Sequence, residues 1–346
     1  MLKLKKVKKF FYINTLYSLF ICLLLENNLD ENFYFFSSKF SKSIAKNIKN
    51  KIVIKEKRSL RIIDYILGAI FFRIIKLIFS KRVKNKDFYI CDKGKYAQYF
   101  FNNYEANFIL VEDGTMNYNI QDLEKVITKS KIKLSFSKKL RKNFVYGVKK
   151  IYPSLGISEK IQKIILTGIL PIPEIIKPKV ELINLENRWK KLSKEKQKKI
   201  LEIFNINLNE IKNLENSKNK ILLLTQPLSE DEIIDEKEKI NMYKKILKER
   251  EIKEIFIKEH PREETNYIFE FDDIKVNIIS KEFPIEILLL DIKFDKVITI
   301  FSTAALNFKN KSEVEFIGTK NYPKLIEKFG VIENNKIEDI YNKEIV

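Results

Sequence analysis

The chain has 346 residues, of which 45% are hydrophobic, so it is long enough to bury two hydrophobic cores of ordinary size. Its 2 cysteines lie in apolar stretches without a CxxC spacing, so the sequence indicates neither a disulfide framework nor a zinc site. The net charge of +20 favours anionic partners such as phosphates, acidic lipids or nucleic acids. The lysines accompany abundant Ile, Asn and Phe, a composition typical of AT-rich coding, so charge alone does not indicate nucleic-acid binding.

The amino-terminal segment combines a basic stretch, Lys3 to Lys9, with an apolar stretch, Phe10 to Leu25, as a signal peptide does. It lacks a small-residue cleavage site, and polar residues interrupt an apolar stretch already shorter than the ~20 residues that a membrane-spanning helix needs. We therefore predict a strand over residues 10–14 and a helix over residues 15–26.

Strands and helices alternate through the rest of the first half. Each predicted strand is a short apolar run bounded by polar residues. These strands cover residues 32–38, 51–57, 87–92 and 107–112. The predicted helices between them cover residues 39–49, 59–81 and 95–103. Alternation of this kind indicates a parallel sheet covered by helices.

The predicted helix over residues 59–81 is apolar around much of its surface. Asp64, Arg73, Lys76 and the basic residues that flank the segment favour an amphipathic helix over a membrane span. Two interpretations remain open for it, packing between two domains and contact with a membrane surface.

Prolines concentrate near the middle of the chain. Pro171, Pro173 and Pro178 are three of its 8 prolines and fall in one short stretch. Such a stretch is typical of a connection between domains. We therefore expect an N-terminal domain over residues 1–170 and a C-terminal domain over residues 171–346.

The second half begins with a predicted helix over residues 189–204 and then repeats the alternation. Its predicted strands cover residues 220–225, 254–258, 275–279, 296–300 and 313–317. Its remaining predicted helices cover residues 232–250, 284–290, 302–308 and 322–329. Two Rossmann-like, doubly wound α/β halves that face a central cleft form the arrangement called GT-B in glycosyltransferases, and this is the fold class we predict.

His260, the only histidine of the chain, follows the predicted strand over residues 254–258. Open α/β sheets bind their ligands at the carboxyl ends of their strands. Pro261 stiffens the loop, and Arg262 places a guanidinium beside the imidazole, which suits an anionic substrate. A lone histidine is more often structural than functional, so the functional interpretation needs support from the neighbouring loops.

Three other loops carry polar groups at the same kind of position. Asp113 lies in an acidic turn after a strand of the first half, and the loop from Gln226 to Asp231 follows a strand of the second half. Ser302 and Thr303 begin a predicted helix, where hydroxyls and free backbone amides form an anion site. Each feature alone is more commonly a turn or a helix cap. Together with the histidine they predict a transferase that moves a sugar from a nucleotide donor.

Four segments together resemble bacterial sialyltransferases, and most of all the lipooligosaccharide group, glycosyltransferase family 52. These segments are Glu112-Asp113-Gly114, TQPLSED from Thr225 to Asp231, KEHPRE from Lys258 to Glu263, and FSTA from Phe301 to Ala304. The likeness extends from the Asn14-Thr15 junction to the region near Ile317, and QPLSED and KEHPRE are its most specific parts. One departure is Glu259, where we expect proline or another neutral residue.

The resemblance implies an inverting transfer of sialic acid from CMP-sialic acid to a terminal galactose-type sugar of a lipid-linked oligosaccharide. No metal or other cofactor would take part. His260 would be the general acid, and Asp231 is our first choice as the base, with Asp113 as the alternative because a related sialyltransferase family uses the aspartate of its acidic-Asp-Gly motif. The residues expected to bind the donor are Ser302, Thr303, Pro261, Arg262 and Gln226.

We expect a cytoplasmic enzyme, peripheral on the inner membrane, because its acceptor would be found there and its amino-terminal tail is basic. A homodimer is compatible with the sequence. A nucleic-acid partner is not expected, since the basic residues are spread along the chain and no helix-turn-helix, zinc-finger or RNP-like signature is present. The alternatives are another GT-B glycosyltransferase, a polysialyltransferase of surface glycans, or a non-catalytic basic protein that binds anionic membranes or nucleic acids.

Overall fold

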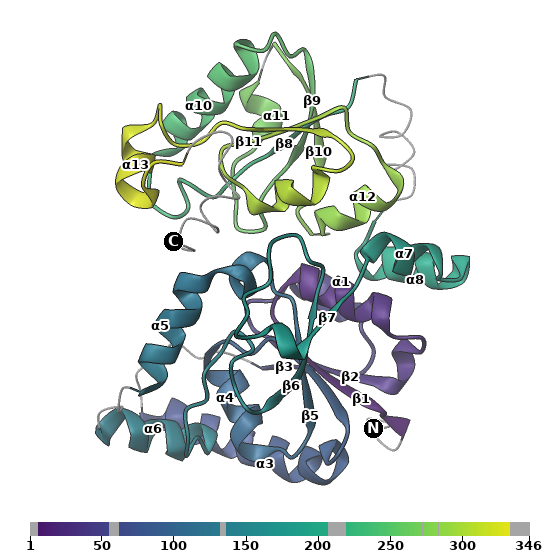
Figure 1. The fold of residues 1–346 in the computed structure, drawn as a ribbon, viewed down its shortest axis with the longest axis vertical. Helices are drawn as coiled ribbons and strands as arrows, with labels where there is room; N and C mark the ends of the chain where they lie inside the picture. The colour runs from purple at the N-terminus through teal and green to yellow at the C-terminus, as the bar shows by residue number, and fades with distance from the viewer. Residues whose placement is uncertain are drawn as a thin grey trace. The chain divides into compact units, whose positions relative to one another are not determined.

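The computed structural model describes residues 6–54, 62–131, 136–206, 219–271, 273–282 and 284–332. The chain divides into two compact units, Met1–Ile203 and Phe204–Val346, and each is built around one parallel sheet (Figure 1). None of the helices in the described part of the chain is long and apolar enough to cross a membrane.

The described part of the first unit contains a seven-stranded parallel sheet. Its strands are β1 (Lys9–Ile13), β2 (Asn32–Ser37), β3 (Lys51–Ile54), β4 (Asp87–Ile90), β5 (Asn107–Val111), β6 (Ile161–Leu166) and β7 (Val180–Leu182). They lie in the order β3-β2-β1-β4-β5-β6-β7, so the direction in which the sheet grows reverses between β1 and β4. This is the doubly wound Rossmann order, which places a ligand-binding edge at the carboxyl ends of the strands beside the reversal.

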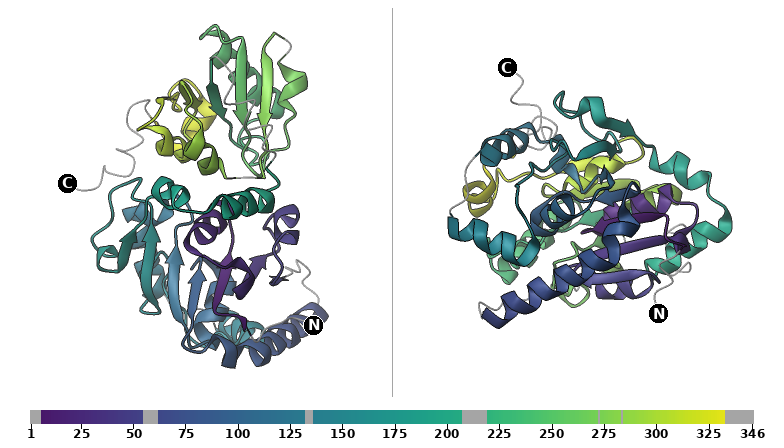
Figure 2. Two further views of the ribbon diagram at one scale, coloured as in Figure 1. Left: turned by 90° about the vertical axis from the view of Figure 1, so that its right-hand side faces the viewer. Right: turned by 90° about the horizontal axis from the view of Figure 1, so that it is seen from below.

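The helices of the first unit cover both faces of this sheet (Figures 1 and 2). They are α1 (Leu16–Leu25), α2 (Lys42–Lys46), α3 (Ile62–Val83), α4 (Gly94–Asn103), α5 (Ile120–Lys131), α6 (Phe136–Tyr146), α7 (Leu185–Lys190) and α8 (Lys194–Ile203). Short 3₁₀ turns are η2 (Leu29–Glu31), η3 (Thr115–Tyr118) and η4 (Lys177–Lys179). On one face α1 contacts α7, and on the other α6 contacts both α3 and α4.

Aromatic side chains fill the core of the first unit. The ring of Phe11 on β1 stacks between Tyr34 of β2 and Tyr89 of β4, with a centroid distance of 4.8 Å to each. Such stacking joins the three adjacent strands and adds to the stabilisation from burial.

The boundary between the two units lies later in the chain than the division after residue 170 that the prolines suggested. β6 and β7 extend the first sheet beyond β5, so the proline-rich stretch connects two strands of one sheet. α7 also packs against α1, where the rings of Phe20 and Trp189 lie 6.4 Å apart. The predicted helix over residues 189–204 is divided between α7 and α8.

The described part of the second unit contains a five-stranded parallel sheet. Its strands are β8 (Ile221–Leu224), β9 (Glu254–Lys258), β10 (Lys275–Ile279), β11 (Lys296–Thr299) and β12 (Glu313–Phe316). Its helical elements are α10 (Glu236–Lys248), α11 (Tyr267–Glu270), η5 (Ile285–Ile287), α12 (Leu288–Asp291), η6 (Thr303–Phe308) and α13 (Pro323–Phe329). The order β10-β9-β8-β11-β12 repeats the reversal of the first sheet, now between β8 and β11. The prediction of two Rossmann-like α/β halves is confirmed.

Candidate active site

In the second unit, the loops after β8, β9 and β11 leave the sheet at one edge. β8 pairs with both β9 and β11, so the three loops are neighbours, and the outer two begin about 10 Å apart because adjacent strands lie ~4.8 Å apart. The β8 loop carries Gln226 and Asp231, and the β9 loop carries His260. The β11 loop carries Ser302 and Thr303. The structure therefore brings these predicted residues to the edge beside the strand-order reversal.

His260 lies just past the end of β9 and is half-buried. Its Nδ1 accepts a hydrogen bond from the backbone N–H of Arg262 at 3.2 Å, so Nε2 carries the proton of the neutral ring. Burial, together with the positive charges of Arg262 and Lys258, lowers the pKa of His260 to about 4. At neutral pH the ring of the free protein is therefore uncharged, and an anion bound beside it would favour protonation.

Glu263, a buried residue that our sequence analysis did not single out, anchors the loop that holds His260. Its carboxylate accepts hydrogen bonds from the backbone N–H of His260 (2.7 Å), the hydroxyl of Thr225 (2.5 Å) and the hydroxyl of Tyr267 (2.7 Å). The ammonium of Lys239 lies 3.7 Å from the Oε1 of Glu263. Burial raises the pKa of Glu263. In the sequence its only signal was its place as the last residue of the KEHPRE segment.

Glu230 joins the β8 loop to the β9 loop. It pairs with Lys239 of α10 at 2.9 Å, and its other carboxylate oxygen accepts the backbone N–H of Glu264 at 2.7 Å. Burial alone would raise the pKa of Glu230, but the hydrogen bond from Glu264 and the contacts with Lys239 outweigh burial and lower the pKa to about 2. The Glu230 carboxylate therefore stays charged at neutral pH, and its hydrogen bond from Glu264 fixes the two loops to each other.

Asp231, the first choice for the base, is held by an ion pair with Arg262. The Nη2 of Arg262 lies 2.9 Å from the Oδ2 of Asp231, and Nη1 contacts Oδ1. The side chain of Asp231 is 35% exposed and that of Arg262 is 60% exposed, so the ion pair is open to solvent and a ligand could displace either partner. In this state the predicted base and a predicted donor-binding residue are engaged with each other.

Ser302 and Thr303 stand at the start of a helical turn, as predicted. Ser302 is the N-cap of η6, and Thr303 is the first residue of this 3₁₀ segment. The backbone N–H of Ser302 donates to the hydroxyl of Thr299 at 3.1 Å, and that hydroxyl donates to the carbonyl of Leu224 at 2.9 Å. The backbone amide of Ser302 is thus already used, so an anion would be bound by the two hydroxyls and by amides from Thr303 onward.

Gln226 and Pro261 border the same edge. The backbone N–H of Gln226 donates to the hydroxyl of Tyr243 at 3.0 Å, which fixes the start of the β8 loop. The Oε1 of Gln226 is buried and has no hydrogen-bond partner within the described ranges, so it could accept a hydrogen bond from a bound ligand. Pro261 is exposed beside His260.

In the first unit, Glu112 of the acidic motif after β5 is a structural residue. It is fully buried and accepts hydrogen bonds from the hydroxyl of Tyr118 (2.9 Å), the hydroxyl of Tyr17 (3.1 Å) and the backbone N–H of Thr167 (2.5 Å). These bonds connect α1, η3 and the loop after β6, which gives the buried carboxylate of Glu112 a structural role.

Asp113, the alternative base, is placed differently. It is only partly buried, and its Oδ1 accepts a hydrogen bond of 2.5 Å from the hydroxyl of Thr15, the residue that caps α1. Burial raises the pKa of Asp113, while the Thr15 hydroxyl and the charge of Lys93 act in the opposite direction. No ion pair like that of Asp231 with Arg262 holds Asp113 among the described residues.

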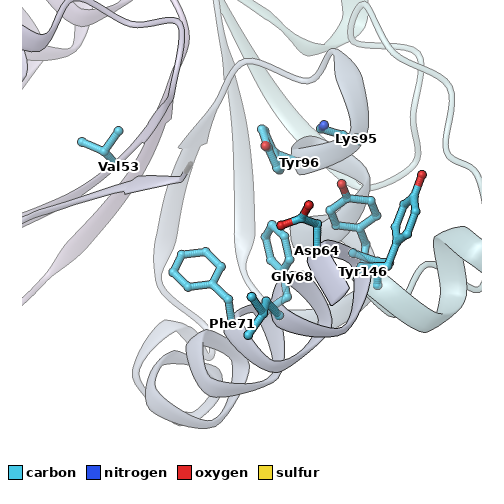
Figure 3. Close-up of a pocket in the computed structure, with 11 residues that line it drawn as sticks. Val53, Asp64, Gly68, Phe71, Lys95, Tyr96 and Tyr146 are labelled. Carbon is cyan, nitrogen blue, oxygen red and sulfur yellow. The ribbon is translucent and has the colours of Figure 1, made fainter. Parts of the chain in front are cut away.

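A separate cavity of about 380 Å³ lies between α3, α4 and α6, outside the predicted site (Figure 3). Aromatic rings including Phe72, Tyr96 and Tyr146 line it, together with Gly68 of α3. Across the described ranges, no cluster of three or more His, Cys, Asp or Glu side chains is arranged to hold a metal ion.

Comparisons with known proteins identify the family. The chain matches the model of "Glycosyltransferase family 52" over residues 18–321. It is 38% identical over 230 residues to an uncharacterized protein of Haemophilus influenzae. The aligned region covers 66% of this chain and 68% of that protein.

Two solved structures share the fold. One is an α/β-galactoside α-2,3-sialyltransferase from Photobacterium phosphoreum, with 15% identity, a TM-score of 0.56 and 90% of both chains covered. The other is a 2,6-sialyltransferase from Photobacterium sp. JT-ISH-224 in complex with CMP and lactose, with 13% identity, a TM-score of 0.56, and coverage of 88% of this chain and 70% of that chain. The predicted GT-B-type fold class is thereby confirmed. Because the family model spans most of its length, this protein belongs to glycosyltransferase family 52.

Proposed function

We propose that this glycosyltransferase moves sialic acid from CMP-sialic acid to a terminal galactose-type sugar of a lipid-linked oligosaccharide, with inversion at the anomeric carbon. Family membership supports this proposal. The observation that carries it is the position of His260, held by Glu263 on a stiff loop and separated by a single strand, β8, from the loop where Ser302 and Thr303 begin η6.

The charges around His260 suit a donor that carries a phosphate. Burial, followed by the smaller effects of the positive charges of Arg262 and Lys258, lowers the pKa of His260 to about 4 in the free protein. A CMP phosphate would oppose those two cations, so its binding would raise the histidine pKa and favour the imidazolium. The protonated ring could then donate to the departing phosphate, which is the task of a general acid.

The chemistry of sialic acid requires two kinds of help. It reacts at a crowded ketosidic carbon that bears a carboxylate, so the transition state resembles an oxocarbenium ion, and catalysis consists of stabilising the departing CMP and removing a proton from the acceptor hydroxyl. We assign the first task to His260, with the hydroxyls of Ser302 and Thr303 and the start of η6. This division of labour is complete without a metal ion.

For the base we favour Asp113, although the sequence led us to Asp231 first. Burial raises the pKa of Asp113, and a carboxylate of higher pKa is a better proton acceptor. The carboxylate of Asp231 is occupied by Arg262, which would have to be released before Asp231 could accept a proton. In this assignment Asp231 orients Arg262 for the donor phosphate, and it becomes a positioning residue.

The test is an incubation of the protein with CMP-Neu5Ac and lactose in the presence of EDTA, followed by mass spectrometry. We expect sialyllactose and free CMP in wild-type reactions, and an initial rate of formation of both that is lower by about 10²–10⁴ with His260→Ala. Parallel reactions with UDP-sugars provide the donor control. Transfer from a UDP-sugar in place of CMP-Neu5Ac would contradict the proposed donor, and activity that EDTA abolishes would contradict the metal-free mechanism.

A further inference from the structure

The long helix α3 carries a stripe of exposed apolar side chains. Seven of its large apolar residues are between 37% and 80% exposed, and they are Ile63, Ile66, Leu67, Ile70, Ile74, Leu77 and Ile78. They recur at intervals of three and four residues, so they fall within an arc of about 120° on one side of the helix. We call this set the α3 stripe.

The stripe dominates the exposed apolar surface. Within the described ranges, sixteen large apolar side chains are exposed, and nine of them belong to α3 or to Leu140 and Phe144 of the neighbouring helix α6. Scattered apolar residues on a surface need no explanation, but a contiguous patch of this kind marks an interaction site.

The opposite side of α3 already packs against the core of the first unit. Phe79 is fully buried there, with its ring centroid 4.8 Å from that of Phe33 on β2 and 6.1 Å from that of Phe10 on β1. Phe72 packs against Tyr99 of α4 at 4.7 Å. The helix is therefore anchored by one face, and the exposed stripe is not needed for that packing.

The exposed charges of α3 and its end are all positive. They are Arg73, Lys76, Lys81, Arg82 and, one residue past the helix, Lys84, which forms an ion pair with the exposed Glu105 at 3.3 Å. The guanidinium of Arg73 lies 5.7 Å from the centre of the Phe144 ring, which connects the basic residues with the apolar surface of α6. The acidic residue of α3, Asp64, lies in its first turn. Apolar residues flanked by cations are typical of helices that lie in the interface of an anionic membrane.

We propose that the α3 stripe, together with Leu140 and Phe144, lies in the headgroup region of an anionic lipid bilayer. The cavity of Figure 3 adjoins this surface, since Leu67 of the stripe and the neighbouring Gly68 both line it. A second copy of the chain is the other occupant that an apolar face could have. Two copies joined through this face would bring like charges together, whereas anionic lipids would neutralise them.

Membrane binding would also keep the enzyme close to a lipid-linked acceptor, and only this consequence rests on the proposed function. The binding itself needs neither donor nor acceptor. It can therefore be measured separately, so that a failure of this inference and a failure of the proposed function are distinguishable.

The experiment is co-sedimentation of the full chain with vesicles of phosphatidylcholine mixed with phosphatidylglycerol, and with vesicles of phosphatidylcholine alone. We expect binding to the mixed vesicles that weakens as salt is added, and weaker binding to the neutral vesicles. Changing Ile70 and Leu77 together to Ser should lower the partition coefficient by about tenfold or more, because two apolar side chains leave the interface. Changing Lys76 and Lys81 together to Gln should lower binding to the mixed vesicles only.

The matched control changes Ile175 and Leu182 together to Ser. These residues belong to the same unit and are 51% and 58% exposed, but they lie outside the stripe. The control should bind vesicles as the wild type does, and all variants should keep the wild-type circular dichroism spectrum and transfer to soluble lactose. Absence of wild-type binding, or equal loss in the control, would overturn the proposal. A wild-type dimer that the Ile70/Leu77 variant dissociates, without vesicle binding, would identify the face as a dimer interface.

Discussion

Arg262 forms a bidentate ion pair with Asp231 at the carboxyl ends of the strands of the second unit, with Nη2 and Oδ2 2.9 Å apart. The pair joins the last residue of the QPLSED segment to the fifth residue of the KEHPRE segment, and these two segments are the most specific parts of the family resemblance. It gives Asp231 an evident role as a partner for a cation. In our proposal the proton acceptor is Asp113, whose pKa is raised by burial.

Two substitutions compare these aspartates. Asp113→Asn should lower kcat by about 10²–10⁴, because the acceptor hydroxyl loses its base. Asp231→Asn should mainly raise KM for the donor, since Arg262 loses the partner that orients it. In the wild type, kcat should fall as the pH drops through the pKa of Asp113, at a higher pH than an ordinary aspartate would give, and Asp113→Asn should abolish this limb. Steady-state kinetics across pH measures both effects. The reverse pattern, with the limb lost only in Asp231→Asn, would return the role of base to Asp231.

His260 should be needed for turnover and dispensable for folding. His260→Ala removes the proposed acid, so kcat should fall by about 10²–10⁴ at unchanged thermal stability. His260→Gln is the matched variant, because its amide can still donate a hydrogen bond to phosphate but cannot transfer a proton. It should restore part of the CMP affinity and little of the turnover. Near-normal turnover in His260→Ala would make the residue structural.

The single histidine also allows a direct pH measurement. The ring resonances of His260 in NMR spectra should titrate near pH 4 in the free protein, well below the usual value of 6.5. Because the unfolded chain binds this proton at a higher pH than the folded chain, the residue should reduce stability as the pH falls from about 6.5 towards 4. Added CMP should move the titration upward, since its phosphate favours the imidazolium. A pKa that CMP leaves unchanged would show that the phosphate binds elsewhere.

The strands were predictable because each is a short apolar run that ends at polar residues. β9 and β10 have the predicted limits, and β8 and β11 differ from theirs by one residue at one or both ends. β6 was not predicted, because the polar pair Gln162-Lys163 interrupts its apolar residues and about fifty residues separate it from its partner β5. β7 has only three residues and two of them are exposed, so its place in the sheet depends on β6. Missing these two strands is what placed the domain boundary too early.

The sequence was enough to assign the residues expected to surround the ligand to particular loops. It was not enough to predict which of their side chains form hydrogen bonds or ion pairs with one another. Alternation of strands and helices is enough to place His260, Gln226 and Ser302 at one sheet edge. Which side chains then bind each other depends on distances across that edge. The ion pair of Asp231 with Arg262 has no local signal in the sequence, and the only signal for the anchoring role of Glu263 is its place at the end of the KEHPRE segment.

Glu263 should be a positioning residue for the histidine loop. Glu263→Ala would leave the backbone N–H of His260 and the hydroxyls of Thr225 and Tyr267 without their acceptor, and would remove one of the carboxylates around the buried Lys239. We expect a loss of roughly 2–4 kcal/mol in the free energy of unfolding, measured with urea.

Glu263→Gln keeps an acceptor oxygen and should recover much of that stability. Because the histidine loop would be less firmly held, kcat should fall in both variants while KM for the acceptor stays close to the wild-type value. Unchanged stability in Glu263→Ala would contradict the anchoring role, and unchanged kcat in a folded Glu263→Ala would contradict the positioning role.

The start of η6 should bind the donor rather than the acceptor. Thr303→Ala removes a hydroxyl at the first position of the segment, and Ser302→Ala removes the hydroxyl of its N-cap. Each should weaken CMP binding by about tenfold or more, the usual scale for a hydrogen bond to a charged group, and leave the acceptor KM almost unchanged. Calorimetry with CMP and acceptor kinetics separate the two effects. Thr303→Ser is the matched control, because it keeps the hydroxyl and should bind CMP as the wild type does. An acceptor KM that rises more than the CMP dissociation constant would move this segment to the acceptor side of the reaction.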